Sequence, residues 1–312
     1  MFKRMLYRKI FVASSLLAII MMLYLIPGHD VQIKQDVNYV SSSNKAVIFL
    51  LDENDYVSRT NIAVSSLNTL DVTNDLVDAM TKDGIRNDII PKGFKSILPV
   101  GTRVLDLSLK DGILKINLSK EFNNISSSIE EKVFESLVYT LTSIPGIDKI
   151  DLYVDSNKLL KYPNSKKMLP NYLDKSLGIN KKYEMTSLND VDVFTIYYVS
   201  NNSDESYYIP VTKYINNNNK DRVRVIIDEL SSSLIHESNL ASYLDMSAKL
   251  LDYEIIDEKI KLNFDDKILS SITENNVLEE VMYSVGLSLC DEFDIKEVVF
   301  MVNNVEKGVF RE

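Results

Sequence analysis

The chain begins with a basic cluster and a long hydrophobic run. The run extends from Ile10 to Ile26 without a charged residue, which is at the short end of the range for a membrane-spanning helix. It is longer than the core of a typical signal peptide, and no small-residue cleavage site precedes Pro27. We therefore expect residues 1–27 to form a cytoplasmic basic flank and an uncleaved membrane anchor, with a cleaved secretory signal as the alternative. This topology is that of a single-pass membrane protein whose remaining residues lie outside the cytoplasm.

A polar segment, residues 28–45, follows the hydrophobic run. It has no helical periodicity and ends in a run of serines. This composition is typical of a flexible stalk. His29 lies in the segment, and we interpret it as an ordinary stalk residue.

Hydrophobic periodicity then predicts a first folded region, residues 46–160. The apolar run AVIFLL, which begins at Ala46, is typical of a buried strand. The segment VTNDLVDAMTKDG has helical periodicity, and Gly84 is a suitable C-terminal stop. The expected buried face of this helix consists of Val72, Leu76, Val77 and Met80. Alternating apolar residues on both sides of Asp111-Gly112 predict a tight hairpin, because this pair readily adopts positive φ angles.

A second helix and a last strand complete the region. In SSSIEEKVFESLVYTLTSIPG, Ser128 and Glu131 match a capping box, and Pro145-Gly146 is expected to end the helix. Its apolar stripe consists of Val133, Phe134, Leu137 and Leu141. The segment KIDLYVD then predicts a strand. This order of strand, helix, hairpin, helix and strand predicts an α+β fold, a small mixed sheet with two helices packed on one face.

The same order of elements returns in residues 191–312, after a connector of residues 161–190. The segments VFTIYYVS, DRVRVIIDELSSSL, KLLDYEIIDEKIKLNF, NNVLEEVMYSVGLSLCDEF and EVVFMVN predict the corresponding strand, helix, hairpin, helix and strand. The expected buried face of the first of these helices consists of Ile226, Ile227, Leu230 and Leu234. Four polar residues also recur, since Asp106, Asp111, Lys115 and Asn117 correspond to Asp252, Asp257, Lys261 and Asn263. We infer a tandem duplication that yields two similar domains.

Composition and motifs argue against several classes of function. The 312 residues carry a formal net charge of -10 with a pI near 4.9, which argues against a nucleic-acid partner. The single cysteine, Cys290, excludes an internal disulfide framework and a cysteine-rich metal site. No glycine-rich phosphate loop follows a predicted strand, which agrees with a fold other than a doubly wound nucleotide-binding one.

The residues that could carry chemistry have structural interpretations. His236 lies at a predicted helix end, where we expect a capping or surface role, and Cys290 is expected to be a small buried residue. We assign Asp111 and Asp257 to the hairpin turns, and Asp106 and Asp252 to a solvent-exposed strand face. We expect the side chains of Asn117 and Asn263 to form hydrogen bonds that hold the ends of their strands. Cation binding is the functional alternative for the four aspartates. We therefore predict no catalytic, cofactor-binding or metal site.

Two segments, LPVGTRVLDLSLKDGILKINLSKEF and ESLVYTLTSIPGIDKIDLYVD, resemble the GerMN domain of sporulation and spore germination proteins. The connector segment MLPNYLDKSLGINKKYE is similar to the one that joins two such domains in GerM-type proteins. The likeness is weaker in the second repeat, where Glu292-Phe293 replaces Pro-Gly. No lipid-acceptor cysteine follows the hydrophobic run, so the chain departs from the lipoprotein form of this family. The resemblance implies two tandem GerMN domains similar to the ring-building modules of secretion systems.

The resemblance also implies a non-enzymatic spore envelope protein that supports the channel complex between mother cell and forespore, and later germination. Its expected location is the mother-cell side of the intermembrane space. Expected partners are proteins of that complex, further copies of this chain, and the membrane through the N-terminal helix. The alternative is a protein that binds or modifies cortex peptidoglycan, with tyrosines as glycan contacts: Tyr153, Tyr197, Tyr198, Tyr207 and Tyr208. Tyrosines at alternating strand positions belong more often to a sheet surface.

Overall fold

The computed structural model describes residues 44–202, 205–217, 220–232, 240–270 and 276–311. These residues belong to one compact unit, Asn44–Glu312. The predicted membrane anchor, and all of the predicted stalk except its last two residues, lie outside the described residues. Within the described ranges, no helix is long and apolar enough to cross a membrane.

The two repeats contain the same series of elements. In the first repeat these are β1 (Lys45–Asp52), β2 (Val57–Ala63), α2 (Thr69–Met80), β3 (Phe94–Lys95), β4 (Val104–Lys110), β5 (Ile113–Leu118), α3 (Glu130–Thr142), β6 (Lys149–Val154) and β7 (Asn157–Lys158). The connector contributes β8 (Lys182–Tyr183). In the second repeat the elements are β9 (Val191–Asn202), β10 (Glu205–Asn216), α4 (Arg222–Ser231), β11 (Leu250–Ile256), β12 (Lys259–Phe264), α5 (Glu279–Phe293), β13 (Glu297–Val302) and β14 (Val305–Arg311). Apart from β3 and β8, each element of one repeat has a counterpart in the other.

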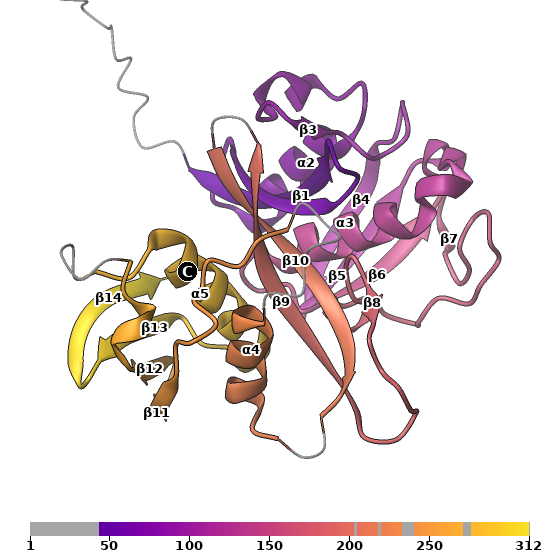
Figure 1. Ribbon diagram of the computed structural model, residues 1–312. Helices are drawn as coiled ribbons and strands as arrows, with labels where there is room; N and C mark the ends of the chain where they lie inside the picture. Colours follow the sequence, from indigo (N-terminus) through magenta and orange to yellow (C-terminus); the bar gives the residue numbers. More distant parts are fainter. Residues whose placement is uncertain (1–43, 203–204, 218–219, 233–239, 271–275, 312) are drawn as a thin grey trace, which may run out of the picture. The chain divides into compact units, whose positions relative to one another are not determined.

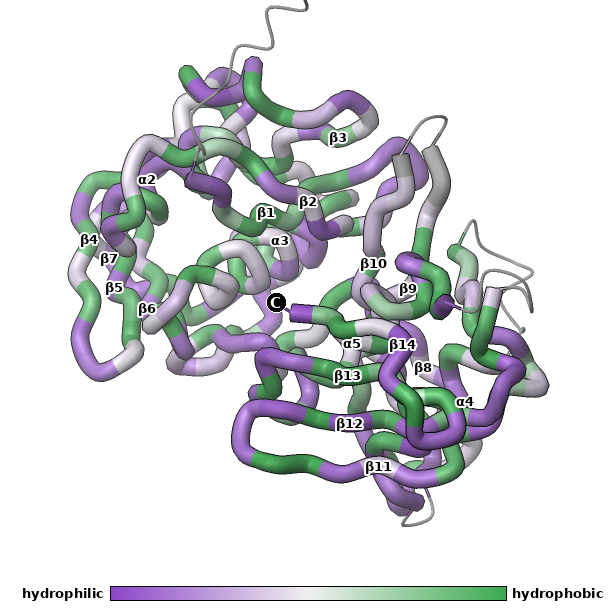
Figure 2. Tube along the Cα trace, turned by 90° about the vertical axis from the view of Figure 1, so that its left-hand side faces the viewer, coloured by the Kyte–Doolittle hydropathy of each residue, from purple (hydrophilic) through white to green (hydrophobic). Residues whose placement is uncertain are grey.

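Each repeat has a four-stranded mixed sheet, ordered β4-β5-β6-β7 in the first and β11-β12-β13-β14 in the second. The predicted hairpins β4–β5 and β11–β12 are antiparallel, and the strands β5–β6 and β12–β13 are parallel. Hydrophobic and hydrophilic positions alternate along β12 of the second sheet (Figure 2). The helices pack against these sheets, α2 and α3 in the first repeat and α5 in the second. The predicted mixed-sheet architecture is confirmed.

The apolar helix faces form two hydrophobic cores, one in each repeat. All the residues predicted for the faces of the two helices in the first repeat are buried: Val72, Leu76, Val77, Met80, Val133, Phe134, Leu137 and Leu141. In α4, Ile226, Ile227 and Leu230 are buried, whereas Leu234 lies outside the described residues. Periodicity of 3.6 residues was therefore sufficient to find the buried faces.

The opening strand of each repeat does not join the four-stranded sheet, contrary to the prediction. Instead, β1 pairs with β2 and β9 pairs with β10, so each repeat opens with an antiparallel hairpin. Strand β2 also pairs with β10 at Arg59 and Tyr208, which joins both hairpins in one six-stranded sheet (Figure 1). Its order is β3-β1-β2-β10-β8, with β9 paired to β10. The sequence pattern does not indicate β2, because this strand is mostly polar. Nor does it indicate β10, because this strand contains Pro210, which cannot donate a backbone hydrogen bond.

Two predicted helix ends are wrong. Helix α3 begins at Glu130 with Ile129 as its N-cap, so Ser128 and Glu131 do not form a capping box. Ser128 belongs to a short 3-10 helix that precedes α3. Helix α2 ends at Met80 because Thr81 is extended, with ψ of 133°. Gly84 has a negative φ and precedes the next 3-10 helix, so it is not the stop of α2.

In both repeats, a side-chain hydroxyl of one helix, α3 or α5, forms a hydrogen bond with the opening hairpin. In the first repeat, the Phe49 N–H of β1 donates to Thr140 Oγ1 of α3 at 2.9 Å. In the second, the Tyr197 N–H of β9 donates to Ser288 Oγ of α5, also at 2.9 Å. These bonds satisfy buried strand N–H groups, and an unpaired buried N–H is costly. The duplication therefore preserved this hydrogen bond, which the sequence pattern did not indicate.

Candidate functional site

A buried carboxylate lies where the two opening hairpins meet. Asp52, at the end of β1, is fully buried. Its Oδ1 accepts the N–H groups of Asn54 at 2.9 Å and Tyr56 at 2.8 Å. Its Oδ2 accepts the hydroxyls of Ser58 at 3.1 Å and of Tyr207, from β10, at 3.0 Å. Burial raises the pKa of Tyr207 to about 12, so this hydroxyl stays protonated and donates across the junction at neutral pH.

Asn180 of the connector ties three elements together at the same junction. Its side-chain oxygen accepts the Val57 N–H of β2 at 3.0 Å. Its side-chain nitrogen donates to the carbonyl oxygens of Val57 and of Pro210 in β10, both at 2.8 Å. Its own N–H donates to Glu135 Oε2 of α3 at 3.0 Å. Asn180 has a φ of 46°, a left-handed conformation that asparagine tolerates better than most residues.

The connector also binds the second repeat directly. Ile179 and Thr212 of β10 exchange two hydrogen bonds, from the Ile179 N–H to Thr212 Oγ1 at 2.9 Å and from the Thr212 N–H to the Ile179 carbonyl at 2.8 Å. Lys175 forms an ion pair with Asp291 of α5. Together with the β2–β10 pairing, these contacts hold the repeats in a defined relative arrangement. We call this set of contacts the inter-repeat junction.

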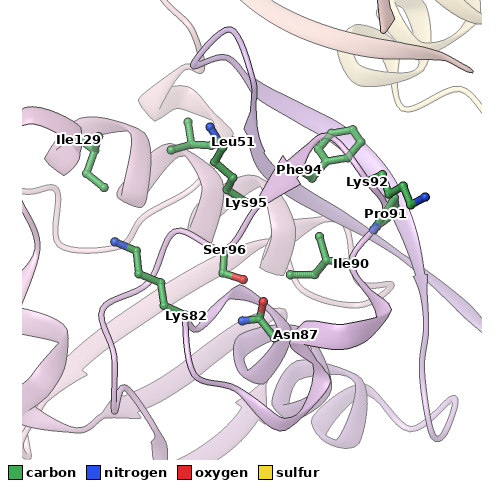
Figure 3. Close-up of a pocket in the computed structure, with 10 residues that line it drawn as sticks. All are labelled: Leu51, Lys82, Asn87, Ile90, Pro91, Lys92, Phe94, Lys95, Ser96 and Ile129. Carbon is green, nitrogen blue, oxygen red and sulfur yellow. The ribbon is translucent and has the colours of Figure 1, made fainter. Parts of the chain in front are cut away.

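A basic groove lies in the first repeat, beside the end of β1 and the edge strand β3 (Figure 3). Its volume is about 510 Å³, and its lining includes the apolar side chains of Leu51 and Phe94. Three lysines line it as well: Lys82, Lys92 and Lys95. None of the three forms an ion pair with another residue that the structure describes. We call this feature the lysine groove.

A second, larger cavity of about 700 Å³ lies at the N-terminal end of α3 and differs in its charges. Two of its four lysines are paired with its own glutamates, Lys167 with Glu131 and Lys181 with Glu135. Four acidic residues in the lining balance the four lysines in charge: Asp55, Glu130, Glu131 and Glu135. Glu130 accepts the Ser165 N–H at 3.0 Å. Burial opposes ionisation of Glu130, but the backbone donors outweigh burial and lower its pKa. The charges of this cavity are thus neutralised within the protein.

Both four-stranded sheets have an exposed terminal strand with the same irregularity. The pairing of β4 with β5 shifts between Val104 and Asp106, and that of β11 with β12 shifts at the equivalent place, between Leu250 and Asp252. The extra residues are Leu105, which is 53% exposed, and Leu251, which is 47% exposed. β-Bulges commonly occur at sheet edges and redirect a side chain. Each repeat thus presents an apolar side chain to solvent at the edge of its sheet.

The repeated polar residues have the structural positions that the sequence predicts. Asp111 and Asp257 start the hairpin turns with φ of 52° and 51°. Asn117 Oδ1 accepts the Ser156 N–H, and Asn263 Oδ1 accepts the Asn304 N–H, both at 2.9 Å. Asp106 and Asp252 are exposed, and Cys290 is buried. His236 lies outside the described residues. Among the described residues, no cluster of His, Cys, Asp or Glu is able to hold a metal ion.

The five tyrosines weighed as glycan contacts do not form one surface. Tyr197 and Tyr198 are buried, so they are neither groove aromatics nor sheet-surface residues. Tyr207 binds Asp52 in the inter-repeat junction. Tyr208 stacks on Tyr283 with ring centroids 5.3 Å apart. Tyr153 lies under the ammonium group of Lys115, 4.7 Å from its ring centroid. The residues that matter most for the arrangement of the repeats, Asn180 and Asp52, were not singled out from the sequence.

Comparison with known proteins places both repeats in one family. The family described as Germane, sporulation and spore germination, matches residues 43–160 and 195–308. The chain is 30% identical over 269 residues to the spore germination protein GerM of Bacillus subtilis strain 168, covering 84% of this chain and 72% of that protein. It also resembles the solved structure of the tandem GerMN domains of the sporulation protein GerM from Bacillus subtilis, with a TM-score of 0.76 and 28% identity. That likeness covers 85% of this chain and 92% of the solved one. The chain therefore belongs to the Germane family of sporulation and spore germination proteins, as a GerM-type protein with two tandem GerMN domains.

Proposed function

We propose that this protein is a membrane-anchored, extracytoplasmic scaffold of sporulation. In this role it supports the assembly of the channel complex between mother cell and forespore, and later germination. The inter-repeat junction carries the proposal, because it holds two copies of one domain in a defined arrangement. A scaffold needs such an arrangement, since it must present several binding surfaces at fixed positions. The uncharged run from Ile10 to Ile26 supports the anchoring.

The exposed sheet edges suggest how the scaffold binds other proteins. A terminal strand can pair with an extended segment of a partner, and exposed side chains then provide specificity. Leu105 and Leu251 lie at equivalent places on the terminal strands β4 and β11. Natural proteins usually protect such edges with charges or covering loops. Two exposed leucines at edge bulges are therefore suited to contacts with partner proteins.

The proposal is tested in a sporulating strain that carries a fluorescent channel component. Deletion of the gene is expected to stop that component from concentrating at the engulfing septum. Replacement by the Leu251→Lys variant is expected to have the same effect, because a charged side chain cannot be buried in the contact. The variant is expected to fold, since Leu251 is about half exposed. Unchanged localisation of every channel component in the deletion strain would refute the scaffold role.

The matched control is Leu188→Lys, which makes the same chemical change at a residue that is 86% exposed and lies in the loop between β8 and β9, outside the strands. This variant is expected to support normal localisation. Loss of localisation with both variants, at equal protein levels, would contradict a specific role for the β11 edge. Immunoblotting of membrane fractions provides the protein levels.

A further inference from the structure

We propose that the lysine groove binds an acidic, extended segment of a partner protein. The proposal names the chemistry of one partner contact, and it rests on the scaffold role proposed above. The groove lies in the first repeat, and its lining comes from the end of β1, the segment after α2, and β3. It is distinct from the exposed leucines of β4 and β11. Its charges, its apolar lining and its position at a sheet edge support the proposal.

The charge of the groove is opposite to that of the chain. The protein has a formal net charge of -10, yet the groove lining contains three lysines and no acidic residue. Lys82, Lys92 and Lys95 form no ion pair with any residue in the described ranges. In the larger cavity beside α3, by contrast, four acidic residues of the lining balance its four lysines, and two of these lysines are ion-paired. Only the lysine groove thus offers a concave surface of uncompensated positive charge among the described cavities, and this favours an anionic ligand.

The lysines are spread along the groove. Figure 3 shows the ammonium groups of Lys82 and Lys92 pointing toward opposite sides, with Lys95 between them. A single small anion would be held best by groups that converge on one point. Spaced ammonium groups instead match a ligand that carries several carboxylates along its length. Ammonium groups act as hydrated point charges, so these contacts would be sensitive to salt.

Part of the groove lining is apolar, and its residues are held in place by contacts with the rest of the first repeat and with β10. Phe94 packs edge-on against Tyr207, with ring centroids 5.1 Å apart and an interplanar angle of 67°. Ser96 Oγ donates to the Ala79 carbonyl at 3.0 Å, and Asn87 Nδ2 donates to the Thr81 carbonyl at 2.6 Å. These contacts hold Phe94, Ser96 and Asn87 of the lining in place. The ligand is therefore expected to carry apolar groups as well as carboxylates.

The position of the groove favours a peptide. Strand β3 is the terminal strand of the six-stranded sheet and pairs on one side with β1. An extended peptide beside β3 would continue the sheet, with alternate side chains directed into the groove and toward the lysines. A peptide in which acidic and aliphatic residues alternate meets both requirements. The fold thus provides charge, apolar contact and a strand edge in one place.

The test uses the full chain in a neutral detergent and a fluorescein-labelled octapeptide in which Glu and Val alternate. Fluorescence anisotropy measures its affinity, with an octapeptide of alternating Gln and Val for comparison. We expect the Glu peptide to bind, and the triple variant Lys82→Gln, Lys92→Gln, Lys95→Gln to weaken binding about tenfold, since one exposed ion pair contributes about twofold to fivefold. Raising the salt concentration from 50 mM to 500 mM is expected to weaken wild-type binding in the same direction.

The control is the triple variant Lys110→Gln, Lys120→Gln, Lys149→Gln. It removes the same charge from exposed lysines outside the groove and is expected to change the affinity less than twofold. Equal weakening by both triple variants, or equal binding of the Gln peptide, would overturn the proposal. Binding of anionic phospholipid vesicles or of purified peptidoglycan through the groove lysines, without binding of the Glu peptide, would overturn it as well. Failure of peptide binding would leave the septal localisation result untouched, so the two proposals fail separately.

Discussion

Replacement of Asn180 by alanine tests whether the inter-repeat junction stabilises the protein. The substitution removes three hydrogen bonds, one accepted from Val57 and two donated to Val57 and Pro210. Each such bond contributes about 1 kcal/mol to the free energy of unfolding. Alanine also tolerates the φ of 46° less well, which adds about 1 kcal/mol. We therefore expect the variant to lose about 4 kcal/mol of unfolding free energy.

Asn303→Ala is the matched control for Asn180→Ala. Asn303 has a φ of 48° and is exposed in the turn between β13 and β14, where its side chain forms no hydrogen bond with another residue that the structure describes. It should therefore lose only the conformational contribution of about 1 kcal/mol. The difference between the two variants isolates the three hydrogen bonds, at about 3 kcal/mol.

Urea denaturation of the full chain in neutral detergent, followed by far-UV circular dichroism, measures both variants. If the junction couples the repeats, the wild-type protein is expected to unfold in one transition and Asn180→Ala in two, because each repeat has its own hydrophobic core. A difference below about 0.5 kcal/mol between the variants, with one transition in each, would refute the reasoning, since it lies within the usual effect of surface substitutions.

Two further predictions concern buried groups. Thr140→Val leaves the Phe49 N–H without its acceptor and should lower the free energy of unfolding by about 1–3 kcal/mol. Thr140→Ser keeps the hydroxyl and should lower it by less. Urea denaturation measures both variants, and equal losses would contradict the importance of this hydrogen bond. Burial raises the pKa of Tyr198 to about 12, so its contribution to stability is complete below the unfolded pKa of about 10 and declines as the pH rises from there toward 12. Between pH 9 and 11, the free energy of unfolding should therefore fall less steeply with pH in Tyr198→Phe than in the wild-type protein. The two slopes should differ by at most about 1.4 kcal/mol per pH unit, and identical slopes would argue against this titration.

The sequence alone predicted the features that depend on residues close together along the chain. Asp111-Gly112 indicated its hairpin because the turn requires positive φ angles, which both residues have in the structure. The apolar faces of α2 and α3 followed from helical spacing. Asn117 and Asn263 were assigned to strand ends, and each accepts a backbone N–H from the adjacent turn. The repeat and its resemblance to GerMN domains could be recognised because these local patterns occur twice.

Tertiary structure alone decided how the repeats are joined and where the groove lies. Strand β2 is too polar to be recognised locally, and its pairing with β10 connects Arg59 with Tyr208, far away in the sequence. Asn180 contacts Val57, 123 positions away, and no periodic pattern marks such a pair. Hydrophobic periodicity reports only which side of an element is buried, not which other element covers it. The junction and the lysine groove arise from the pairing and packing of distant segments, so only the folded chain determines them.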